Sequence, residues 1–130
     1  MDKVKIKLNK EHKVVLNLSH SHMEDFCHAV SYMVDMYCRI TSDKSISKMF
    51  NQSDAMTLLQ EAIFLELYNR LMKSANSPIR GTYIPADKYT VKLTKAEAVA
   101  FWVAVNPINT IQDNRPSLRF ILDQIHKLLS

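Results

Sequence analysis

Residues 3–18 read KVKIKLNKEHKVVLNL, and in both halves of this stretch apolar side chains alternate with polar ones. Alternation with a period of two is typical of strands that bury one face against a core. If both apolar sets face the same core, residue 8 lies opposite residue 14 and residue 6 opposite residue 16. This register requires an odd-length connection around residues 10–12. We therefore predict an antiparallel hairpin made of residues 3–8 and 13–18.

The first helix should follow this hairpin almost at once. Apolar residues recur at three- and four-residue steps over residues 23–38, which is typical of one buried helical stripe. Ser21 and Glu24 have the spacing of a capping box, in which each side chain accepts a hydrogen bond from the other residue's backbone N–H. We expect a helix that starts after Ser21 and ends near residue 40.

A polar connection over residues 41–47 should lead into a second helix, which starts between residues 51 and 53 and runs to about residue 74. Apolar residues go almost all the way round this helix. Such a pattern favours either a central place in the fold or a second face shared with another subunit.

Residues 74–88 hold the only glycine of the chain and two of its four prolines, which predicts a long loop. Residues 89–93 then alternate as a third strand. Thr94 and Glu97 form a second capping box, which predicts a helix that runs through residue 105 and is buried on nearly every side. Asn106-Pro107 should end it.

The last helix should begin at Pro116, because proline suits a first helical turn. The resulting order β-β-α-α-β-α-α predicts an α+β fold, in which a three-stranded antiparallel or mixed sheet is packed on one side by about four helices. With 130 residues the chain has the size of a single compact domain, which we expect to span residues 1–130.

Composition excludes several functions. A single glycine, Gly81, cannot supply a phosphate-binding loop of either common nucleotide-binding type, so we expect no nucleotide and no cofactor. The longest apolar run, residues 98–105, is far shorter than the roughly 20 residues that span a bilayer, so we expect no membrane insertion. The charged N-terminal residues are unlike a signal peptide, and we expect a cytoplasmic protein.

Residues 20–28, HSHMEDFCH, hold three of the five histidines and one of the two cysteines. His20, His22 and His28 are therefore candidate metal ligands. On a helix that starts here, however, His28 and Cys27 point in different directions and the first two histidines lie more than a turn away. We interpret the stretch as a helix start, with no metal bound and no catalytic residue assigned.

A second candidate site is a row of lysines. Residues 1–20 contain five lysines and two acidic residues, which gives +3 of the chain's net charge of +4. The alternation predicts that the strand lysines share the face opposite the core, where they could contact the phosphates of a nucleic acid. We favour a solvated face instead, because stacking aromatics are missing there. The predicted lysine face consists of Lys3, Lys5, Lys7, Lys13 and Lys92.

Three apolar residues outside the predicted core, Tyr83, Ile84 and Phe120, are candidate contacts for a protein partner. Together with the second helix, they favour a non-enzymatic module for protein–protein interaction or assembly, by self-association or with a protein partner. A nucleic-acid-binding accessory protein that uses the lysine face is the alternative. The bias toward Lys, Asn and Ile resembles that of small proteins from AT-rich bacterial or phage genomes.

Overall fold

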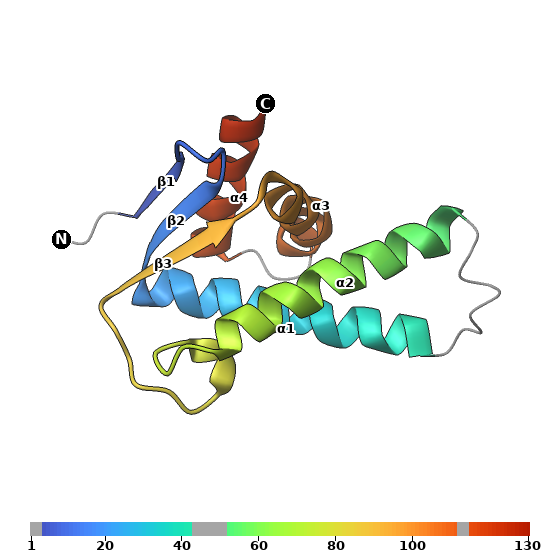
Figure 1. Ribbon diagram of the computed structural model, residues 1–130, viewed down its shortest axis with the longest axis horizontal. Helices are drawn as coiled ribbons and strands as arrows, with labels where there is room; N and C mark the ends of the chain where they lie inside the picture. The colour runs from blue at the N-terminus through green and yellow to red at the C-terminus, as the bar shows by residue number, and fades with distance from the viewer. Residues whose placement is uncertain (1–3, 43–51, 112–114) are drawn as a thin grey trace.

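The computed structural model describes the backbone of residues 4–42, 52–111 and 115–130 (Figure 1). Its elements follow the predicted order β-β-α-α-β-α-α, and the predicted α+β class is confirmed. Lys3, a member of the predicted lysine face, lies outside the described residues, as does the part of the predicted connection that follows residue 42.

Three strands form one antiparallel sheet in the order β1-β2-β3. The strands are β1 (Lys5–Leu8), β2 (Val14–Ser19) and β3 (Lys88–Leu93). Between β1 and β2, Ile6 lies opposite Leu16 and Leu8 opposite Val14, so the predicted register is confirmed.

The turn between β1 and β2 is built around Asn9. Its Oδ1 accepts hydrogen bonds from the backbone N–H groups of Glu11 at 3.0 Å and Lys13 at 2.9 Å. His12 adopts a positive φ of 61°, a conformation that histidine tolerates better than most residues. Local side-chain bonds of this kind let a turn without glycine close the hairpin.

Among the described residues, the remaining elements are four α-helices and one 3₁₀ turn. They are α1 (His20–Ser42), α2 (Gln52–Met72), η2 (Pro78–Arg80), α3 (Lys95–Ile111) and α4 (Pro116–Leu129). In Figure 1 the strands lie at one end of the molecule, and the paired helices α1 and α2 extend away from them.

The helices cover one face of the sheet, because the inward side chains of β2 and β3 are buried and most of the alternate ones are not. Aromatic rings join the helices behind this face: the Phe26 and Phe101 ring centroids are 4.9 Å apart, and those of Tyr37 and Phe64 are 5.8 Å apart. Burial of such rings is a main source of the folding free energy.

The start of α1 differs from the prediction. The helix begins at His20, so Ser21 lies inside the first turn and cannot be its N-cap. Ser19 now precedes the helix, and its Oγ lies 2.8 Å from Nδ1 of His22. β2 pairs with β3 as far as Ser19, and this pairing fixes where the strand gives way to the helix. The predicted capping box at Ser21 and Glu24 is therefore wrong.

The second predicted capping box is confirmed at the start of α3. The Glu97 backbone N–H donates to Thr94 Oγ1 at 3.1 Å, and the Thr94 N–H donates to Glu97 Oε1 at 2.8 Å. These two bonds satisfy two of the donors that a helix start leaves unpaired.

The predicted end of α3 is wrong, since the helix continues through Pro107 to Ile111. A proline inside a helix removes one hydrogen bond and costs about 3 kcal/mol. In the extra turn, Ile108 packs against the core and Asn109 Oδ1 accepts the backbone N–H of Arg115 at 3.0 Å, and these contacts offset that cost. The expectation that α3 is buried on nearly every side is also wrong, because Val99 and Val103 are about half exposed.

Candidate functional site

His20 links the start of α1 to the long loop. Its Nε2 lies 3.0 Å from the Tyr83 hydroxyl, and its Nδ1 lies 3.1 Å from Oε1 of Glu24. Tyr83, which the sequence suggested as a partner contact, therefore bonds within its own chain. The pKa of the Tyr83 hydroxyl is raised by desolvation and by the nearby carboxylate of Glu24. A phenol of this kind stays protonated and can donate to the imidazole.

His22 has a different neighbourhood. It lies beside Ser19 and meets the Phe120 ring edge-on, with 5.9 Å between ring centroids. Burial lowers the pKa of His22, and the carboxylate of Asp25 opposes this shift. His28 is exposed on another side of α1. Within the described ranges, no three His, Cys, Asp or Glu side chains gather into a metal site.

Cys27 ties the same loop to the middle of α1. The thiol is buried, its Sγ lies 3.8 Å from Ser77 Oγ, and burial raises its pKa. The loop is also closed on itself, since Asn76 Nδ2 donates to the Ile84 carbonyl at 2.8 Å. Ile84, another candidate partner contact, is 67% exposed.

The predicted lysine face forms on the outer side of the sheet. Lys7, Val15 and Lys92 lie in one cross-strand row, and Lys5 lies one row further along. Lys13 directly precedes β2, and its Nζ is 3.9 Å from Oε2 of Glu11.

Between these lysines the face carries small polar groups. Thr90 Oγ1 donates to Asn17 Oδ1 at 3.1 Å, and Val15 is buried among longer side chains. No aromatic ring lies in the cross-strand rows that pair residues 5–8 with 14–17 and 90–93. A surface of this kind can attract phosphates by charge, but it lacks a stacking platform for bases.

In the first half of α2, apolar side chains are exposed at several positions. The exposed fractions are 55% for Met56, 40% for Leu58 and 59% for Leu59, and we call these three residues the α2 patch. Polar side chains lie inward instead. Glu61 is half-buried and receives a hydrogen bond from Thr41 of α1.

Gln60 shows the same inversion. Its Oε1 is buried and has no hydrogen-bond partner among the described residues. No sequence motif marks Met56, Leu58 or Leu59 as exposed. The available signal was the apolar pattern that goes round α2, but only the position of α1 shows which residues face outward.

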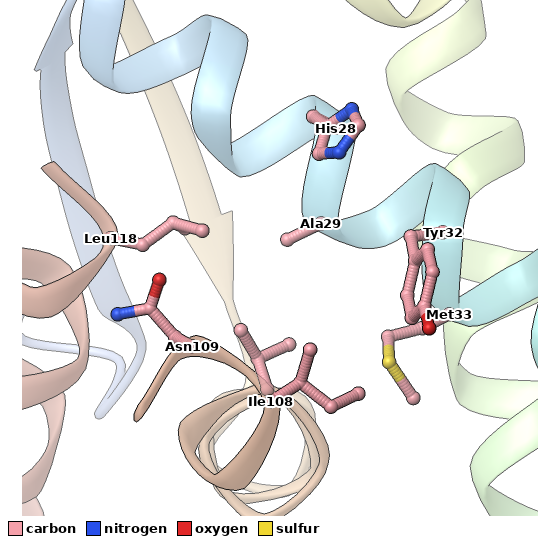
Figure 2. A pocket seen from close by; sticks show the side chains of 8 residues that line it. His28, Ala29, Tyr32, Met33, Ile108, Asn109 and Leu118 are labelled. Carbon is pink, nitrogen blue, oxygen red and sulfur yellow. The ribbon is translucent and has the colours of Figure 1, made fainter. Parts of the chain in front are cut away.

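A cavity of about 90 Å³ lies between α1 and the ends of α3 and α4 (Figure 2). Figure 2 shows Asn109 and Ile108 on one side of it, with Tyr32 and His28 of α1 across from them. Asn109 Oδ1 accepts the backbone N–H of Arg115 at 3.0 Å, so this side chain positions the start of α4. The cavity has room for a few water molecules and is far smaller than pockets that hold nucleotides or drug-sized ligands.

Comparison with protein-family models, with curated proteins and with solved structures gives no match for this chain. Over residues 4–42, 52–111 and 115–130, no helix combines the length and the apolar character needed to cross a membrane. We therefore infer the function from the surfaces of the fold.

Proposed function

We propose that the chain is a non-enzymatic assembly module that associates with a second copy of itself through the α2 patch. One observation carries the proposal: in the first half of α2, leucines face outward while Gln60 and Glu61 face inward. An isolated surface helix has the opposite arrangement, with its apolar stripe toward the core.

The energies favour a covered patch. Burying a leucine or methionine side chain fully contributes about 1.5–3 kcal/mol, so three that are about half exposed forgo roughly 2–5 kcal/mol, which is a large part of the net stability of a small domain. This exposure is explained if α2 packs against protein on its outer side as well.

The end of α1 extends this surface. Thr41 bonds to Glu61, so the preceding residue, Ile40, lies at the level of the first half of α2, and its side chain is exposed. Apolar residues grouped on a pair of helices are the usual centre of a homodimer interface.

Sedimentation equilibrium with a matched pair of variants tests the proposal. Leu59→Glu places a charge in the α2 patch, and Asn69→Glu places the same charge on an exposed position of the second half of α2. The wild type and Asn69→Glu should be dimers at about 100 μM, whereas Leu59→Glu should be a monomer that remains folded. A monomeric wild type at that concentration overturns the proposal.

Polyanion binding by the lysine face is the second candidate. It is favoured by the row in which Lys7 and Lys92 flank Val15. Among the described residues, Glu11 is the only acidic residue paired with a lysine of this face. If Lys5 and Lys7 contact phosphates of duplex DNA, replacing both by glutamine should reduce the fitted number of neutralised phosphates by about two. An unchanged salt dependence contradicts this function.

A further inference from the structure

Among the described residues, no strand pairs with the outer edge of β3. β3 pairs with β2 on one side only, and Arg70 Nη2 donates to the Lys92 carbonyl oxygen at 3.2 Å from the other side. The Lys92 carbonyl therefore points away from β2. Backbone groups alternate in direction along a strand, so the N–H and C=O of Thr90 also point away from β2.

A groove runs beside this edge. Its volume is about 430 Å³, and the end of α2 and the loop that follows it form the opposite wall. In Figure 1 the yellow loop that follows α2 returns to the sheet at the start of β3. The apolar part of the lining includes Met23 of α1 and Leu71, and Ser74 and Asn76 contribute polar groups.

The groove is strongly basic. Four cationic residues line it, and its lining among the described residues includes no Asp or Glu. Behind the lining, the buried Glu97 bonds to Arg70 at 3.1 Å, and the exposed Glu11 lies 3.9 Å from Lys13. The cationic lining residues are Lys13, Arg70, Lys88 and Lys92.

We propose that this groove binds an extended acidic peptide segment of a partner protein as a fourth, antiparallel strand. The segment pairs its backbone with Thr90 and directs carboxylates toward Lys88 and Lys92, while its alternate apolar side chains face Met23 and Leu71. Strand addition at an open edge takes affinity from the backbone bonds and specificity from alternate side chains. Antiparallel pairing matches the rest of the sheet.

The charges on the edge lysines also protect a strand from random pairing. Protection alone requires only charged side chains at the edge, whereas here the edge opens onto a groove with an apolar lining beneath it. The lysine charges that discourage pairing with an arbitrary strand attract an acidic segment. The same charges therefore account for both protection and specificity.

The test uses a peptide as long as β3, with alternating glutamate and valine, titrated into the full chain and followed by fluorescence anisotropy. The peptide should bind, and its lysine–valine counterpart should bind at least about tenfold more weakly. Lys88→Glu combined with Lys92→Glu should weaken binding by a similar factor. Reversing the exposed Lys95 and Lys127 should leave the affinity unchanged.

Backbone methylation of the peptide provides the test of strand pairing. In an antiparallel strand, the glutamates lie on the same face as Thr90 and their N–H groups point at β3, whereas the valine N–H groups point away. Methylating the glutamate amides should abolish binding, and methylating the valine amides should not. Equal effects of the two methylations, or equal binding of the acidic and basic peptides, overturn the proposal. Binding of a single-stranded oligonucleotide, but not of the peptide, through Lys88 and Lys92 assigns the groove to nucleic acid and also overturns it.

Discussion

Replacing Glu97 by alanine should lower the free energy of unfolding by about 2–3 kcal/mol. The Glu97 carboxylate accepts the Thr94 N–H at 2.8 Å and bonds to Arg70 at 3.1 Å, and its side chain is only 8% exposed. Loss of the cap costs about 1 kcal/mol, and loss of a charge-assisted bond costs about 1.5–3 kcal/mol. Arg70 is 40% exposed and regains hydration when the carboxylate is removed. The total loss in unfolding free energy therefore stays near the lower end of the summed range.

Urea unfolding at neutral pH measures this change, with the slope against denaturant expected to be the same in all variants. Glu97→Gln keeps an acceptor for the Thr94 N–H and should lose about half as much as the alanine variant. Glu24→Ala is the control, because Glu24 pairs with His20 but is 51% exposed, and it should cost less than about 1 kcal/mol. Similar losses for Glu97→Ala and Glu24→Ala would refute the assignment of Glu97 as the link between α2 and α3.

Three further outcomes follow from burial and charge. Leu16→Ala should cost about 2–4 kcal/mol, since Leu16 is fully buried, while Lys5→Ala should change the stability by no more than about 0.5 kcal/mol. Equal losses for the two variants in thermal or urea unfolding would show that the register is wrong. A thiol reagent should modify the exposed Cys38 in the folded chain and reach the buried Cys27 only on unfolding. Burial lowers the pKa of His22 in the folded state, so the free energy of unfolding should fall as the pH drops from about 7 to about 5. When unfolding is measured across that range, His22→Gln should reduce this pH dependence.

The hairpin register was predictable because it depends on local features. The alternation of residues 3–8 and 13–18 leaves only one pairing that buries both apolar sets, and the structure has this pairing. The cap at Thr94 and Glu97 was predictable for the same reason, since both partners lie within one turn.

The errors occur where distant segments decide. Ser19 and Ser21 are both suitable for capping α1, and the pairing of β2 with β3, about 70 residues further along the chain, determines where the helix begins. Pro107 normally ends a helix, but the packing of Ile108 against the core and the bond from the Arg115 N–H to Asn109 outweigh its local effect.

The candidate site was predictable only in part. The lysine face follows from strand alternation alone, so Lys5, Lys7 and Lys92 lie where the sequence places them. Tyr83 was a candidate partner contact, and its bond to His20, between residues 63 positions apart, was not predictable from any local pattern. The outward direction of Leu59 likewise depends on where α1 packs, which no local pattern encodes.

The most direct test of the assembly role is a dilution series followed by two-dimensional NMR of the backbone amides. Between about 1 mM and about 10 μM a dimer of moderate affinity dissociates, so amides at its interface shift or sharpen. We predict that these changes centre on the amides of Met56, Leu58 and Leu59 and are absent from β1. Spectra that do not change with concentration, or changes centred on the sheet, would contradict it.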